Sequence, residues 1–441
     1  MENNSLEVET TNDVREIIEL NKTHQEIEAF DAEIETTAQD AEVIQNVQEV
    51  VAKAAEGEGL SPASAELAEV VLESLYGRLG IPKKSIMSLE AYGDPKQRRK
   101  TITRVACEDI KDTLVRIWTA LKEAFAKAWQ NIKMFIAKMF SSVKMARTEI
   151  DRMKEKLNGL SDVELKPIAI EHVTLCKAFS IDGEADAKTV DYIMHNHYTL
   201  ADQSSRISKG CRSFLNKLTD LSGRWSAKDF DAHGRLDLIH AFEKNVVFLR
   251  QEIFPLTITV NKHEGHFVAP RLVNSHFFGV ITPFKDDKQR YTKSNDGETI
   301  DWAIMSSALT PVLMKEQEDK IADKIQTASK EHIEALLTNL VSLCDKLDKM
   351  QHAQTDINEF EKDIQNLFTR TIANLQKQSP DIINHTVDKT ITDIVRYGST
   401  AISRTYGLLI AKLPQLTFEA IRHSLNYIRV SLRQVEEPKA A

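Results

Sequence analysis

The chain has 441 residues, of which 42% are hydrophobic and 28% charged, so its length and composition suit a globular protein of two or three domains. Glycine (15) and proline (11) are scarce, which favours helices over β-sandwiches and barrels. The four cysteines form no CxxC pair, which argues against a zinc ribbon or a disulfide framework. The polar N-terminus lacks the basic and apolar regions of a secretory signal.

The net charge of −9 is distributed unevenly along the chain. Residues 1–90 contain 20 acidic and 6 basic residues, a net charge of −14, which leaves 46 acidic and 51 basic residues, a net of +5, for 91–441. Residues 1–50 have weak helical periodicity and predict a marginal helix or disorder, and Ser61 or Ser64 caps a predicted helix over 65–79. Residues 1–90 therefore form an acidic leader, either a propeptide or a regulatory segment.

The stretch Ile110–Met145 has an 11-residue repeat, which is typical of a helix with an almost straight apolar face. The apolar positions are Leu114, Trp118, Leu121, Phe125, Trp129, Ile132, Ile136, Phe140 and Val143. Two cationic rows flank them, one at Lys111, Lys122, Lys133 and Lys144, the other at Arg116, Lys127 and Lys138. Three interpretations remain open: a core helix with lysines along its edges, a helix on an anionic membrane, or a helix beside nucleic acid. A transmembrane span is excluded, because lysine interrupts every long apolar run.

The acidic leader ends near Ser88-Leu89-Glu90-Ala91, a small-x-Glu site followed by a small residue, and basic residues follow from Lys96 onward. An acidic leader, such a site and a basic, Trp/Lys-rich amphipathic helix together resemble the internal head proteins of large tailed bacteriophages. The similarity is of pattern and covers roughly residues 50–150. Ala54–Glu56, Ser64–Glu66 and Ala241–Glu243 also fit the tripeptide, but Glu90 is the last match before the charge changes sign.

The resemblance implies that a prohead protease cuts after Glu90 and that the mature protein stays in the capsid interior with packaged DNA, after assembly in the host cytoplasm. Its implied partners are capsid or other head proteins, the protease and, non-specifically, DNA; it implies no catalysis and no cofactor. Removing 1–90 would change the net charge from −9 to +5 and strengthen attraction to phosphates. The cations expected to bind nucleic acid or another anionic surface are Arg98, Arg99, Lys100, Arg104, Lys111, Arg116, Lys122, Lys127, Lys133, Lys138 and Lys144.

The remaining sequence predicts a mainly α fold, with a C-terminal helical bundle and a small antiparallel β insertion. The predicted parts are a basic helical region over 91–160 that ends at Asn158-Gly159, a mainly helical domain over 161–254, a β-rich insertion over 255–302 and the bundle over 303–441. Short strands are expected at 168–170 and 173–175. Helices are expected at 187–221, with Asp186 as cap, and at 226–253, 303–350, 355–377, 380–407 and 415–434.

Few side chains suggest chemistry. The one-letter codes of His195-Asn196-His197 spell HNH, the name of a nuclease motif. That motif needs histidines that are separated in sequence, so these adjacent ones do not indicate it. His263 and His266 have metal-ligand spacing, yet positions i and i+3 of a strand face opposite sides, so these residues and His276 are expected to be exposed or hydrogen-bonded. No phosphate loop, GxSxG or HExxH occurs. The alternatives are a peripheral membrane-binding or membrane-active protein using helix 110–146, and an enzyme with an unrecognised site.

Overall fold

The computed structural model describes residues 57–79, 94–160, 165–223, 262–263, 266–281, 291–294, 297–300, 311–315, 320–352, 354–377 and 412–436, together with Gly407 and parts of 36–54. Its longest element is α3 (Pro95–Asn158), which has 64 residues and a length of about 96 Å at 1.5 Å per residue. Asp94 caps its first turn by accepting a hydrogen bond from the Lys96 amide. The helix ends at Asn158 with Gly159 as its C-cap, as the sequence predicts.

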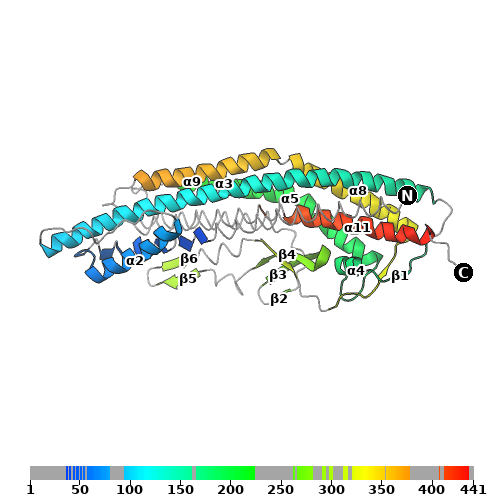
Figure 1. Cartoon of the computed structure of the whole chain (residues 1–441), viewed down its shortest axis with the longest axis horizontal. Helices are drawn as coiled ribbons and strands as arrows, with labels where there is room; N and C mark the ends of the chain where they lie inside the picture. The colour runs from blue at the N-terminus through cyan, green and yellow to red at the C-terminus, as the bar shows by residue number, and fades with distance from the viewer. Residues whose placement is uncertain are drawn as a thin grey trace.

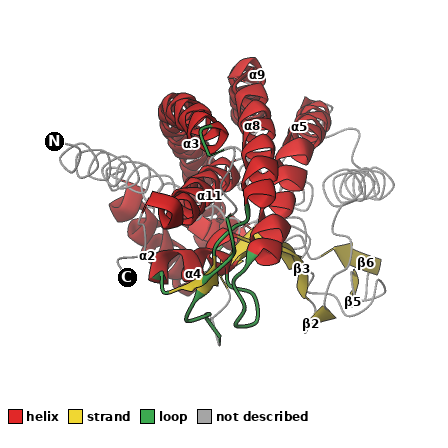
Figure 2. Ribbon diagram, turned by 90° about the vertical axis from the view of Figure 1, so that its right-hand side faces the viewer, coloured by secondary structure: helices red, strands yellow, loops and turns green. Residues whose placement is uncertain are grey.

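Three rows of helices lie side by side along the long axis of the molecule (Figures 1 and 2). The middle row consists of α8 (Lys330–His352) and α9 (Gln354–Lys377), which follow one another along the chain. On one side α3 runs antiparallel to them, so that Lys111 meets Gln376 and Arg147 meets Asp345. On the other side α5 (Ala187–Gly223) runs parallel to them.

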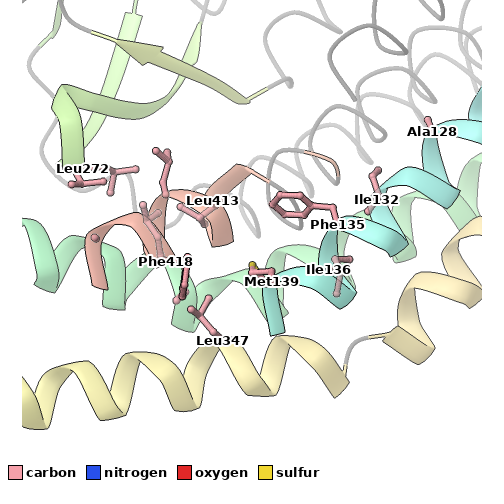
Figure 3. Close-up of a cluster of buried hydrophobic side chains, with 14 of the residues drawn as sticks. Ala128, Ile132, Phe135, Ile136, Met139, Leu272, Leu347, Leu413 and Phe418 are labelled. Carbon is pink, nitrogen blue, oxygen red and sulfur yellow. The ribbon is translucent and has the colours of Figure 1, made fainter. Parts of the chain in front are cut away.

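Two further helices pack against one face of this layer. The helix α11 (Leu413–Glu436) packs against α3, α5 and α8, and its Leu413 and Phe418 share one apolar cluster with Phe135 and Met139 of α3 and Leu347 of α8 (Figure 3). The helix α2 (Pro62–Leu79) lies against the N-terminal half of α3 (Figure 1). The leader, the long helix and the C-terminal helices therefore share one hydrophobic core.

The strands of the described residues form three antiparallel sheets. One sheet has the order β2 (Lys262–His263), β3 (His266–Leu272), β4 (His276–Ile281) and β7 (Pro311–Lys315), and β5 (Tyr291–Ser294) pairs with β6 (Gly297–Ile300). The third pairs β1 (Ala169–Ile170) with β8 (Ile325–Gln326). Between β3 and β4 a short 3₁₀ turn, η1 (Val273–Ser275), enters the helical layer, where it contacts α11 and α4 (Val173–Phe179).

The mainly α fold class is confirmed, but two local predictions are wrong. Residues 173–175, expected as a strand, begin α4, which the His172 side chain caps and which buries Leu175 and Phe179. Residues 303–350, expected to be helical throughout, contain β7 and β8 before α8 begins at Lys330. The helices expected at 226–253 and 380–407 lie outside the described residues, except for Gly407, which is helical. The division into five parts stays a prediction.

Candidate nucleic-acid interface

The apolar face of α3 is the seam of the helical layer. Trp118 and Trp129 are 0% and 2% exposed, and their rings lie against α9, with centroid distances of 5.7 Å from Trp118 to Phe368 and 5.1 Å from Trp129 to Phe360. Phe125 packs on the same Phe368 ring at 5.0 Å. Of the three interpretations of this helix, the core helix is the one that fits its aromatic face, because the rings are buried against α9. Insertion of these rings into a membrane would require α3 to leave the bundle.

One cationic row is occupied by contacts with α9. The Lys111 ammonium donates to the Gln376 carbonyl at 2.9 Å, the Lys122 ammonium donates to the Thr369 hydroxyl at 2.9 Å, and Lys133 forms an ion pair with Glu361. All three lysines are half-buried. The apolar face turns toward α9, so the lysine stems beside it cover the seam while their charged ends reach polar atoms of the neighbouring helix.

Arg147 continues this internal pairing toward α8. Its guanidinium contacts Asp345 at 2.7 Å and Asp348 at 2.6 Å, and Nε donates to the same Asp348 oxygen at 3.1 Å. Burial opposes the charged form of Arg147, but the hydrogen bonds to both carboxylates outweigh it, and the pKa is raised. This arginine therefore fixes α3 to α8 as a permanently charged group.

The other cations of the sequence prediction face outward. Arg116, Lys127, Lys138 and Lys144 are exposed along α3, and Arg98, Lys100 and Arg104 are exposed near its N-terminus. Arg99 is half-buried and lies 3.2 Å from Glu58 of the leader. The eleven predicted cations therefore do not form one surface. Lys111, Lys122 and Lys133 of one row are turned into the bundle, whereas Lys144 of that row and the row with Lys127 are exposed.

Hydrogen bonds and close packing, as well as an ion pair, hold the leader against α3. The Leu60 amide donates to the Thr103 hydroxyl at 2.9 Å, and the Thr113 hydroxyl lies 3.4 Å from that of Tyr76. Gly59 has φ +90°, and a Cβ added there would meet Arg99 at 2.8 Å, so only glycine allows this close approach. The predicted cleavage residues Ser88, Leu89, Glu90 and Ala91 lie outside the described residues.

Sequence reasoning missed the buried polar corner that joins the sheet to the helices. The Asn196 amide donates to the Arg271 carbonyl at 2.9 Å, and His197 accepts from the Val273 amide at 3.2 Å while its other ring nitrogen lies 3.1 Å from the Thr417 hydroxyl. Burial, and secondarily the charge of His276, lowers the pKa of His197 to about 3. The histidine is thus neutral, and its role is to hold η1 in place.

Within the described ranges, the histidines singled out in the sequence do not gather into a metal site. These ranges contain no group of three His, Cys, Asp or Glu residues placed to hold a metal ion. His276 contacts the Val273 carbonyl at 3.1 Å, and His263 pairs with His266 across β2 and β3. None of the helices within the described ranges combines the length and apolar character needed to cross a membrane.

Comparison with known proteins identifies a family. The family model of the phiKZ-like phage internal head proteins matches residues 19–433, a span that includes most of the leader, the whole of α3 and almost all of α11. No curated protein and no solved structure matches the chain.

Proposed function

The chain belongs to the phiKZ-like phage internal head proteins, structural proteins of the virion head interior, and from this premise we propose that it is made with an acidic propeptide, cut after Glu90, and retained with packaged DNA. In this proposal the protein performs no catalysis. Its partners are capsid or other head proteins, a head protease and DNA, which it contacts without reading sequence. It enters the head during assembly in the host cytoplasm.

The observation that carries the proposal is a charge boundary that falls between two described helices, α2 and α3. Net charge changes from −14 over residues 1–90 to +5 over 91–441. The helix α2 ends at Leu79 and α3 begins at Pro95, and the candidate bond at Glu90 falls between them. Glu66, which also fits the tripeptide, lies inside α2. A helix resists proteolysis, so the position of Glu66 within α2 disfavours a cut there, whereas Glu90 belongs to neither described helix.

Cleavage can be tested by mass spectrometry of assembled particles. The proposal expects the mature protein to begin at Ala91, and an intact peptide that spans Glu90 and Ala91 would contradict it. A phage carrying Glu90→Gln should assemble with the uncut chain, whereas the matched Glu66→Gln variant should be processed normally. Normal processing of the Glu90→Gln variant would place the scissile bond elsewhere.

Retention with DNA needs a separate test. Particles that have been gently opened should release the protein with the DNA at low salt and free of DNA at high salt, because a contact built on phosphates weakens as counterions compete. If the protein stays with the empty shell at every salt concentration, its partner is the capsid and the DNA contact is excluded.

A further inference from the structure

We propose that the leader remains bound after the chain is cut, so that the processed protein is a non-covalent complex of residues 1–90 with residues 91–441. We call the second piece the body. The cut itself rests on the proposed function. The binding of the severed leader does not, because it depends on contacts between the leader and α3 that are present in the uncut chain.

The surface that holds the leader is the N-terminal end of α3. Because α9 runs antiparallel to α3 and its Gln376 carbonyl accepts from Lys111, the residues of α3 before Lys111 extend past the end of α9 (Figure 1). Thr103, Ala106 and Ile110 in this end of α3 are nevertheless buried. The helix α2 lies beside them, so the leader is placed to shield them from water.

One side of α2 contributes apolar surface to this contact. Leu72, Leu75 and Tyr76 are buried and belong to the same apolar cluster as Ala106 and Ile110 of α3. Burial of apolar surface drives association as well as folding, and it needs no covalent link between the two surfaces. The severed leader therefore retains the main source of its attachment.

Polar contacts fix the position of the leader at two places. Just before α2 the Leu60 amide donates to the Thr103 hydroxyl at 2.9 Å, and near the end of α2 the Tyr76 hydroxyl accepts from Thr113 at 3.4 Å. Thr103 and Thr113 are 10 residues apart, which is about 15 Å along α3. The leader residues of both contacts precede residue 80, so a cut after Glu90 breaks neither of them.

Close packing at Gly59 supplements these hydrogen bonds. This glycine has φ +90°, and a Cβ there would meet the Arg99 backbone at 2.8 Å. The chain before α2 therefore reaches α3 because position 59 has no side chain. Gly57 provides a matched control, since the nearest atom to a Cβ there is the Ala54 carbonyl oxygen at 3.8 Å.

Retention of the leader changes what the cut does to the charge. Hydrolysis of the peptide bond consumes one water and leaves a new carboxylate and a new ammonium, so the two pieces together keep the net charge of −9. The body has its own net charge of +5 only when the leader has left. Attraction to phosphates is therefore controlled by departure of the leader, which depends on the concentration of the pieces once they are no longer linked.

The experiment cuts the folded, full-length chain at a chosen place. The recognition sequence of a site-specific protease is inserted after Glu90, the purified chain is cut, and gel filtration with mass spectrometry identifies the pieces in each peak. We expect the leader and the body to elute together, at low and at high salt alike. Salt should have little effect, because the ion pair of Arg99 with Glu58 lies in contact with solvent and contributes little. A dilution series then gives the affinity.

Matched substitutions test the contacts. Gly59→Ala should weaken the binding of the severed leader by about tenfold or more, because it adds backbone strain and a clash with α3. Gly57→Ala should leave the affinity unchanged. Thr103→Val changes the body and leaves the leader's own sequence intact. It should weaken binding by about tenfold as well, since the Leu60 amide loses its acceptor.

Three results would overturn the proposal. If the leader elutes apart from the body as soon as the chain is cut, the covalent link alone had held it. Release at high salt but not at low salt would mean that the opposite charges of the two pieces hold them together. Equal affinities of the parent, Gly59→Ala and Thr103→Val would place the contact elsewhere.

The same experiment is independent of the natural cleavage site. The added protease makes the cut, so the measured binding does not depend on what happens to Glu90 in the phage. An uncut Glu90 in assembled particles would exclude the proposed cleavage and leave the measured binding intact. A leader that separates in this experiment would exclude retention and leave the cleavage untouched.

Discussion

The indole of Trp129 on α3 packs against the ring of Phe360 on α9, with 5.1 Å between centroids and 59° between planes. Both side chains are buried, and they belong to segments more than 200 residues apart in the sequence. The contact shows that the aromatic repeat of α3 serves helix packing. Only the opposite, exposed side of the same helix is therefore open to contacts with other molecules.

Trp129→Ala should therefore destabilise the whole helical layer. Removing a buried tryptophan deletes apolar contact and leaves a cavity, which costs about 3–5 kcal/mol of unfolding free energy. Urea denaturation followed by circular dichroism measures the loss. Met134→Ala is the matched control, because Met134 lies on the same helix and is 53% exposed, and it should change stability by less than about 0.5 kcal/mol. Equal effects of the two substitutions would contradict the buried seam.

The long helix could be predicted from its sequence, but the division of its cations could not. The 11-residue repeat predicts the helix and its apolar face, and the structure contains both. The two lysine rows, however, flank that face symmetrically. What distinguishes them is a neighbour such as Glu361, which is 228 residues from Lys133. No local pattern tells which flank an incoming helix will cover.

The two wrong predictions have the same physical origin. Val173–Phe179 contains residues that favour strands, yet it folds as α4 because His172 caps it and Leu175 and Phe179 find buried places among other elements. Ile325 and Ala328 suggest helical spacing, yet Ile325 lies in β8 and pairs with Ile170 of β1. In both segments, contacts distant in sequence outweigh weak local preference.

Arg147→Gln should weaken the joint between α3 and α8. The substitution removes charge-assisted hydrogen bonds to Asp345 and Asp348, at a cost of about 1–2 kcal/mol for a partly exposed site. Lys144→Gln removes the same charge from an exposed position one turn away and should have little effect on stability. Thermal unfolding of both variants at low and high salt gives the comparison, and an equal shift in both would assign the effect to net charge alone.

The stability of the fold should fall in acid partly through His197. Its pKa is lowered by burial to about 3 in the folded chain, whereas the unfolded value is about 6.5. Between these values the unfolded state binds a proton that the folded state does not, so stability is full above pH 6.5 and is lost as pH falls toward 3. At pH 5 the loss through this one group is about 2 kcal/mol relative to pH 7.5.

Two histidine variants separate this contribution from the rest. His197→Gln cannot take up the proton, so the fall in unfolding free energy from pH 7.5 to 5 should be smaller than in the parent chain. It should not vanish, because burial also lowers the pKa of His423, to about 4. His195→Gln, two residues away and exposed, should leave the pH dependence unchanged. A parent-like pH dependence in His197→Gln would exclude His197 as a source of the acid sensitivity.

The leader should behave as part of the helical layer in the uncut chain. Leu72 is 1% exposed and belongs to the same core as α3, whereas Leu67 on the same helix is 67% exposed. Leu72→Ala should therefore accelerate amide hydrogen exchange across 62–79 and, through the Tyr76 and Thr113 contact, across residues 103–117, with a cost to this unit of about 2–5 kcal/mol. Leu67→Ala, the same change on the outer side, should leave exchange at the parent rate. If the two variants exchange alike, the leader does not brace α3, and its removal would then change the charge of the protein without changing its fold.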